Sequence, residues 1–315
     1  MQLIFSTPIS FMLLGITHNL SEYKYLSHLR IRRISMFDGK IAFIGAGAIA
    51  EALVAGLLKS GFVESEQIAV ANREDLGRLN HLHLNYGVLT TTNKELAIAG
   101  TKIVILAVKP KDLTVTIDDC RNFFNEEQVI VSLAAGVSIQ TIKNLIGRDN
   151  LHIVRAMPTT SSFVLKSATA LAFDHEVAFE KVQLIEQLFK QVGITAKVEE
   201  EELHAMTGLF GSGPAYIYYI VEQFERAAMS LGIHRDIAKP FIQQTLVGAV
   251  SMLQETNNSP LTLRKKVTSP NGTTQAGISI LEDNDVSNSF QRCFLRATER
   301  SEEIEIEYKK WMKSN

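Results

Sequence analysis

An apolar run that stops at two glycines one residue apart constrains the fold of this chain more than any other feature. It lies in the sequence KIAFIGAGAIA of residues 40–50, and an amphipathic run over residues 49–59 follows it and ends at Gly61. This order predicts a buried strand, a tight turn and the N-terminus of a helix. Gly45 permits the turn, Gly47 lets the backbone approach a phosphate, and the free N–H groups and positive dipole end of the helix hold the anion. We therefore expect a dinucleotide pyrophosphate to bind at Ile44, Gly45, Ala46, Gly47, Ala48 and Ile49.

Predicted strands and helices alternate from residue 40 to Pro158. Apolar runs predict strands over residues 67–72, 102–108, 128–135 and 151–156; helices are expected over residues 75–84, from Asn93, over 112–124 and over 138–146, the last with Ser138 as N-cap. The expected fold class is α/β, with an N-terminal Rossmann-type parallel sheet covered by helices on both faces. Ligands of such sheets bind at the carboxyl ends of the strands. Beyond the glycine turn, these ends hold Asn72, Arg73, Ala107, Val108, Lys109, Pro110, Ala134 and Ala135.

The end of the second predicted strand is expected to select the cofactor. An acidic residue there would accept hydrogen bonds from the adenosine ribose of NAD. This chain has Asn72 and Arg73 instead, and a guanidinium group suits the 2′-phosphate of NADP. NADP is therefore expected in preference to NAD. The alternative is that Arg73 is a solvated loop residue, partly neutralised by Glu74.

The pattern changes after residue 160, the expected end of a nucleotide-binding domain over residues 36–160. Residues 161–200 are expected to be a connecting segment that completes the N-terminal domain, with a helix over 176–192 and a strand near 194–198. Residues 201–312 are expected to form an all-helical dimerisation and substrate-binding domain. Apolar side chains wrap most of its long helices, over residues 201–231 and 237–255, so these helices need burial on several sides. A second subunit would supply this burial, in a homodimer or in a larger oligomer of dimers. A monomeric helical core would also serve.

Residues 1–35 do not share the pattern that follows. The apolar stretch over residues 3–16 is too short to span a bilayer as a helix and has no basic segment before it. A disordered leader, or a start placed upstream of the true one at Met36, is favoured over a targeting or anchoring segment.

Composition excludes some partners and adds little else. A net charge of −2, with 21% charged residues, gives no electrostatic case for nucleic acid or an anionic membrane. Cys120 and Cys293 have no metal-type spacing and are expected to be reduced thiols in a cytoplasmic protein. The pair His81 and His83 fits a solvated helix face better than a metal site, and no metal is expected.

Two glycine-rich segments, residues 208–216 and 267–277, interrupt the helical half. The second contains serine and threonine hydroxyls at an expected helix start. A helix N-terminus with such hydroxyls can hold a small carboxylate without a charged side chain. The alternative is that these residues form only an N-cap and a turn.

Seven blocks in order make residues 36–302 resemble the pyrroline-5-carboxylate reductase family. They are residues 44–50, 72–73, 107–110, 134–137, 155–158, 211–216 and 269–274. The resemblance implies a Rossmann domain, a helical dimerisation domain and NAD(P)H-dependent reduction of a cyclic imine, the last step of proline biosynthesis. It adds Asn93 and Met157 to the expected cofactor contacts. It also implies that Thr274 is catalytic and hydrogen-bonds the imine nitrogen, and that Ser269, Asn271, Gly272, Thr273 and Thr274 hold the substrate carboxylate.

The chain departs from the family pattern in three places. Thr159, Thr160 and Ser161 stand where Asn-Thr-Pro is usual, Phe210 replaces a small residue, and Asn271 replaces a glycine. Reduction of another cyclic imine and a diverged, non-catalytic NADP-binding paralogue with a regulatory role stay open as alternatives. A β-hydroxyacid dehydrogenase is disfavoured because Ile217 occupies the position of the proton-transferring lysine.

Overall fold

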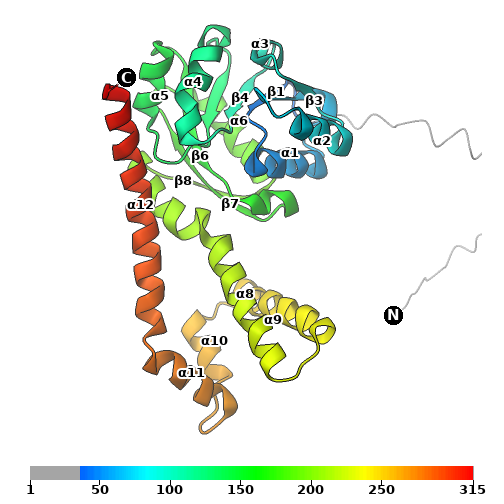
Figure 1. Cartoon of the computed structure of the whole chain (residues 1–315), viewed down its shortest axis with the longest axis vertical. Helices are drawn as coiled ribbons and strands as arrows, with labels where there is room; N and C mark the ends of the chain where they lie inside the picture. The colour runs from blue at the N-terminus through cyan, green and yellow to red at the C-terminus, as the bar shows by residue number, and fades with distance from the viewer. Residues whose placement is uncertain (1–35, 315) are drawn as a thin grey trace, which may run out of the picture. The chain divides into compact units, whose positions relative to one another are not determined.

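The computed structural model of this chain describes residues 36–314 (Figure 1). The expectations for a leader over residues 1–35 lie outside this range. Within the described range, no helix combines the length and the apolar character that crossing a membrane requires.

An eight-stranded sheet, with strand order β3-β2-β1-β4-β5-β6-β7-β8, organises the N-terminal half. Neighbouring strands are parallel except β6 and β7, which are antiparallel. The strands are β1 (Ile41–Ile44), β2 (Ile68–Ala71), β3 (Leu89–Thr91), β4 (Ile103–Leu106), β5 (Val129–Ser132), β6 (His152–Met157), β7 (Ser167–Phe173) and β8 (Gly193–Lys197). The predicted Rossmann-type sheet is confirmed, while the prediction missed β3 and left β7 inside a connecting stretch.

Helices cover both faces of this sheet because successive side chains of its strands point to opposite sides. In β1, Ile41 and Phe43 belong to one buried cluster and Ala42 and Ile44 to the other. The first cluster includes residues of α1 (Ala48–Ser60), α2 (Leu76–Tyr86) and α6 (Phe179–Lys190). The second includes residues of α3 (Lys94–Ile98), α4 (Pro110–Cys120) and α5 (Ile139–Ile146). The predicted N-cap of α5 is confirmed, since Ser138 Oγ accepts a hydrogen bond from the Thr141 N–H.

The part of the described chain that follows β8 is helical. A 3₁₀ turn, η5 (Glu200–Glu202), leads into α7 (Leu203–Met206) and a π-helical turn, η6 (Thr207–Gly211). The longer helices are α8 (Gly213–Ser230), α9 (Arg235–Glu255), α10 (Pro260–Lys266), α11 (Thr273–Asp283) and α12 (Val286–Ser314). The division of the chain into domains near residues 160 and 200 stays a prediction.

The last helix returns to the N-terminal half of the chain. Tyr308, near the end of α12, is buried in the second cluster of the sheet, and its hydroxyl lies 2.7 Å from the Thr114 hydroxyl of α4. Gly136, just after β5, lies under the same helix, where an added Cβ would come within 2.8 Å of Ile304. Helix α12 therefore packs beside α4 and α5 (Figure 1).

Candidate functional site

The two glycines after β1 have different structural roles. Gly45 has φ of +112°, and a Cβ added to it would lie 2.5 Å from the Ala107 carbonyl oxygen of the neighbouring strand end. Gly47 is the N-cap of α1, with φ of −72°, and a Cβ added to it would meet no atom within 4 Å. No side chain caps this end of α1 in the described structure. The helix therefore presents free N–H groups to open space, as an anion site requires.

A hollow of about 520 Å³ lies at the carboxyl ends of β1, β2 and β4. It brings together many of the residues predicted to bind the cofactor: Ile44, Gly45, Ala46, Gly47, Asn72, Arg73, Ala107, Val108 and Lys109. Its lining also contains residues that the sequence reasoning missed: Ala71, Glu74, Lys94, Lys111, Asp112, Val115 and Thr116. The hollow joins the strand ends to the N-terminus of α1, where the phosphates of a dinucleotide could bind. We call it the nucleotide hollow.

Basic side chains, including Arg73 and Lys94, are part of the lining of this hollow. Arg73 donates from Nε to Glu74 across 2.8 Å, and both side chains are largely exposed, so this ion pair contributes little stability. The contact leaves both terminal nitrogens of Arg73 without a partner among the described residues. Lys94, nearly buried, forms an ion pair with Asp119 of α4. Its role could not be seen in the sequence because its partner lies on another element.

The other predicted cofactor contacts do not line the nucleotide hollow. They are Ala48, Ile49, Asn93, Pro110, Ala134, Ala135 and Met157. Asn93 caps α3, where its side chain accepts a hydrogen bond from the Leu96 N–H at 3.2 Å. Met157 faces Gly211 of η6, since a Cβ on that glycine would meet the Met157 sulfur at 2.7 Å. Ala134 is buried in the second cluster of the sheet.

Residues 159–161, which depart from the family pattern, form hydrogen bonds within the fold and line a second hollow. The Thr159 N–H donates to Ser167 Oγ at 3.0 Å, and the Ser162 hydroxyl donates to the Thr159 carbonyl at 2.7 Å. Thr160 and Ser161 line a hollow of about 490 Å³ that also reaches Ala48 at the start of α1. These polar side chains are therefore part of an ordered turn beside the glycine motif.

The residues predicted to bind the substrate form the turn before α11. Asn271 has φ of +56°, the left-handed backbone that a glycine would adopt easily, and its N–H donates to Gln275 Oε1 at 2.6 Å. Gly272 is the N-cap of α11, and no side chain caps this end within the described chain. Thr273 and Thr274 begin the helix and are exposed, and no hydrogen bond to either hydroxyl is found among residues 36–314. Neither threonine hydroxyl therefore caps α11, whose N-cap is Gly272. None of these residues lines the nucleotide hollow.

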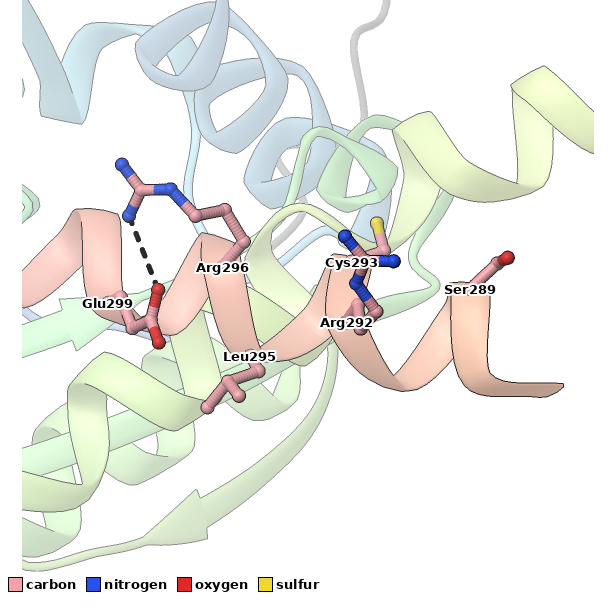
Figure 2. Close-up of a pocket in the computed structure, with 6 residues that line it drawn as sticks. All are labelled: Ser289, Arg292, Cys293, Leu295, Arg296 and Glu299. Carbon is pink, nitrogen blue, oxygen red and sulfur yellow. Dashed lines mark ion pairs between the residues drawn. The ribbon is translucent and has the colours of Figure 1, made fainter. Parts of the chain in front are cut away.

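A third hollow lies along α12, near its start (Figure 2). Its lining, from Ser289 to Glu299, comes from this single helix, and the Arg296–Glu299 ion pair at 3.6 Å spans one turn of it. Because no second element contributes a polar group, this surface is not a candidate active site.

No metal site was found in the described part of the chain, and both of its cysteines are free. No group of three histidine, cysteine or acidic residues lies close enough to hold a metal ion there. Both cysteines are free; burial raises the pKa of the Cys120 thiol to about 12, so this residue stays protonated, and Cys293 is exposed.

The sheet, the glycine turn and the nucleotide hollow together define a dinucleotide-dependent oxidoreductase of the Rossmann class. Residues 40–136 match the family described as "NADP oxidoreductase coenzyme F420-dependent", and residues 200–304 match "Pyrroline-5-carboxylate reductase dimerisation". Pyrroline-5-carboxylate reductase 2 of Bacillus subtilis (strain 168) is 38% identical, over 85% of this chain and 96% of its own. The chain belongs to the pyrroline-5-carboxylate reductase family.

Solved structures agree with this assignment. A pyrroline-5-carboxylate reductase from Coxiella burnetii is 34% identical, with a TM-score of 0.75, over 84% of this chain and 98% of that one. The pyrroline carboxylate reductase of Plasmodium falciparum, solved with NADP bound, has a TM-score of 0.79 at 22% identity, over 85% of this chain and 98% of that one. At 22% identity, the likeness to the Plasmodium falciparum structure shows a shared fold alone.

Proposed function

We propose that this enzyme reduces the cyclic imine of 1-pyrroline-5-carboxylate to L-proline, with NADPH as the hydride donor. The observation that carries the proposal is the uncapped, hydroxyl-bearing start of α11, within the segment that matches the family's dimerisation domain. Two exposed hydroxyls and free N–H groups can receive a small carboxylate and a ring nitrogen. The curated relatives named for this activity support the choice of substrate.

The nucleotide hollow fits a phosphorylated dinucleotide. Gly47 leaves open the space that a Cβ would fill, and the N-terminus of α1 faces it. We propose that the terminal nitrogens of Arg73 bind the 2′-phosphate. When bound, NADPH supplies the hydride. The predicted contacts outside the hollow, Ala48, Ile49, Asn93, Pro110, Ala134, Ala135 and Met157, remain proposals.

The protein has three tasks in this reaction: it must hold the substrate carboxylate, orient the imine and exclude water. We propose that Ser269 and the backbone amides of the Asn271–Thr274 turn hold the carboxylate. The Thr274 hydroxyl then donates a hydrogen bond to the imine nitrogen. As the C=N carbon accepts the hydride, electron density moves to this nitrogen, so the hydrogen bond strengthens in the transition state.

Substitution of Thr274 tests this role. Thr274→Ala should lower kcat by roughly ten- to a thousandfold, the effect of losing about 1–4 kcal/mol of transition-state hydrogen bonding. Thr274→Ser should retain most activity. Because Gly272 is the N-cap of α11, the melting temperature should stay near that of the wild type. Unchanged kcat and KM in Thr274→Ala would remove this hydroxyl from the mechanism.

The substrate itself is tested by following NADPH loss with 1-pyrroline-5-carboxylate and with its six-membered homologue. A higher kcat/KM for the five-membered ring supports the proposal. A preference for the larger ring would make the protein a reductase of another cyclic imine, and no turnover of either would favour a non-catalytic paralogue.

We further propose that the enzyme works in the cytoplasm as a homodimer or as an assembly of dimers. Support for self-association comes from exposed apolar side chains on the helical half, including Ile217, Tyr218, Phe224, Phe241 and Val250. Many large exposed apolar side chains on one set of helices favour burial against a second subunit.

A further inference from the structure

Helix α2 holds the glycine turn through the side chain of Arg78. Its Nε donates to the Ala46 carbonyl oxygen at 2.8 Å, and a terminal nitrogen forms an ion pair with Glu51 in the first turn of α1. The guanidinium is about one-quarter exposed. One planar group therefore joins three segments: α2, α1 and the turn between the two glycines.

Glu51 anchors this arrangement from the α1 side. Its other carboxylate oxygen is 2.9 Å from His81 Nε2 and accepts a hydrogen bond from the Tyr86 hydroxyl, also at 2.9 Å. Burial disfavours the charge of Glu51, but Arg78, His81 and Tyr86 outweigh it, so the pKa of this carboxyl lies below its ordinary value. The carboxylate that orients Arg78 therefore stays charged at neutral pH.

The contact at Ala46 bears directly on Gly47. A trans peptide is planar, so the carbonyl of Ala46 and the N–H of Gly47 point in opposite directions. Because Arg78 draws the carbonyl towards α2, the Gly47 N–H is turned away from α2. Gly47 lines the nucleotide hollow, and its N–H belongs to the uncapped N-terminus of α1.

We propose that Arg78 is a positioning residue for the dinucleotide pyrophosphate: it fixes the Ala46–Gly47 peptide in the orientation that receives the phosphates. This inference rests on the proposed cofactor site. The pyrophosphate is common to NADPH and NADH, so Arg78 supports both cofactors equally. Arg73, by contrast, is proposed to bind the 2′-phosphate, which only NADPH carries.

The two arginines therefore make a matched pair of tests. We would measure the dissociation constants of NADPH and NADH, the melting temperature, and kcat and KM for the imine in full-length variants. Arg78→Gln should weaken both cofactors to a similar extent, about tenfold or more, with kcat at saturating cofactor within about twofold of the wild type. Arg73→Ala should weaken NADPH by a similar factor and leave NADH nearly unchanged.

Two further variants separate positioning from general stability. Arg78→Lys keeps a charge for Glu51 but replaces the planar guanidinium, whose separate nitrogens reach Ala46 and Glu51, with a single nitrogen, so it should still weaken both cofactors severalfold. Tyr86→Phe removes one hydrogen bond to Glu51 without touching the glycine turn, and should leave both affinities unchanged.

Other results would overturn the proposal. Loss of NADPH affinity alone in Arg78→Gln would mean that this residue binds the 2′-phosphate directly. Unchanged affinities would mean that the turn holds its shape without Arg78, and an equal loss in Tyr86→Phe would mean that the packing of α1 on α2 is responsible. Because the dissociation constants and melting temperatures are measured without substrate, they stay decisive even if the wild type reduces no pyrroline-5-carboxylate.

Discussion

At the scale of single residues, the two glycines of one motif are explained by different physical reasons. Gly45 is required by its positive φ and by the closeness of the Ala107 carbonyl, so it belongs to the fold. Gly47 has a φ that any residue can adopt and open space around its Cα. Its lack of a side chain is therefore explained by the ligand rather than by the fold.

Substitution at the two glycines should separate these roles. Gly47→Val should abolish measurable NADPH binding, because the side chain would fill the space left for the phosphates, while the melting temperature stays close to that of the wild type. Gly45→Ala should lower the melting temperature, since a Cβ there meets backbone at 2.5 Å. Calorimetric unfolding and NADPH titration of both variants check this. A strongly destabilised Gly47→Val would contradict it.

Some site residues could be predicted from the sequence because their roles are local. The glycine turn and Arg73 lie directly at strand ends, and the nucleotide hollow contains them. Lys94 could not be predicted, since it joins the lining only after β3 and α4 come together. The helix start at Thr273 and Thr274 was expected from the sequence, but only the structure shows that Gly272 is the N-cap of α11 and that the Thr274 hydroxyl has no partner among the described residues.

At the scale of elements, the buried parallel strands were predictable, and so was β8 at one edge of the sheet, whereas β3 at the other edge and the interior strand β7 were missed. Strands β1, β4 and β5 are continuous apolar runs, as expected for strands buried on both faces. Strand β3 has only three residues, and its Leu89 is exposed. Its sequence therefore shows neither an apolar run nor an alternation of apolar and polar residues that would predict a strand. Strand β7 contains Ser167 and Thr169, whose buried hydroxyls bond one another at 3.1 Å; this pairing becomes visible only in the fold.

Helix α12 contacts α7 through a partly buried acidic group, Glu305. The two ring nitrogens of His204 lie 3.0 Å from the Ser301 hydroxyl and 2.8 Å from the Glu305 carboxylate, and Lys309 also forms an ion pair with Glu305. Burial opposes the charge of Glu305, but Lys309 and His204 outweigh it and hold the pKa of this carboxyl below its ordinary value of 4.5.

The lowered pKa of Glu305 predicts that the free energy of unfolding depends on pH. A carboxyl whose pKa is lower in the folded than in the unfolded state stabilises the fold above its unfolded pKa, and this contribution is lost as pH falls through the folded value. At pH 7, Glu305→Gln should therefore lower the free energy of unfolding by about 1 kcal/mol. The difference from the wild type should shrink as pH falls below 4.5.

Urea unfolding at several pH values measures this difference. Glu302→Gln, at an exposed position of the same helix, is the matched control and should change little at any pH. A Glu305→Gln deficit that is independent of pH would show that the carboxylate charge does not act as described.

At the scale of the whole molecule, the proposed substrate turn lies outside the nucleotide hollow: Ser269 and Thr274 are absent from its lining in the described chain. The helical half also exposes large apolar side chains such as Phe241 and Val250. Association through that half would bury these side chains. It would also let the substrate turn of one subunit serve the nucleotide hollow of the other.

Mixed dimers test this arrangement. Gly47→Val and Thr274→Ala should each be nearly inactive as homodimers. If the site is shared, a co-expressed mixture should recover up to roughly one-quarter of wild-type activity, because half of the dimers are mixed and each mixed dimer has one intact site. Activity no higher than that of the separate variants would place both halves of the site in one subunit. A monomer in light scattering at low micromolar concentration would contradict the dimer itself.

The position of Tyr308 in the buried cluster around α4 and α5 has a consequence for how the chain is made. A ribosome releases the sheet and its helices long before it reaches residue 308. Until α12 emerges, the side of the sheet that this helix covers stays open to water and to chaperones. A nascent chain stopped before Val286 would therefore carry the complete glycine turn and every strand, yet still expose apolar surface that quality-control proteases recognise.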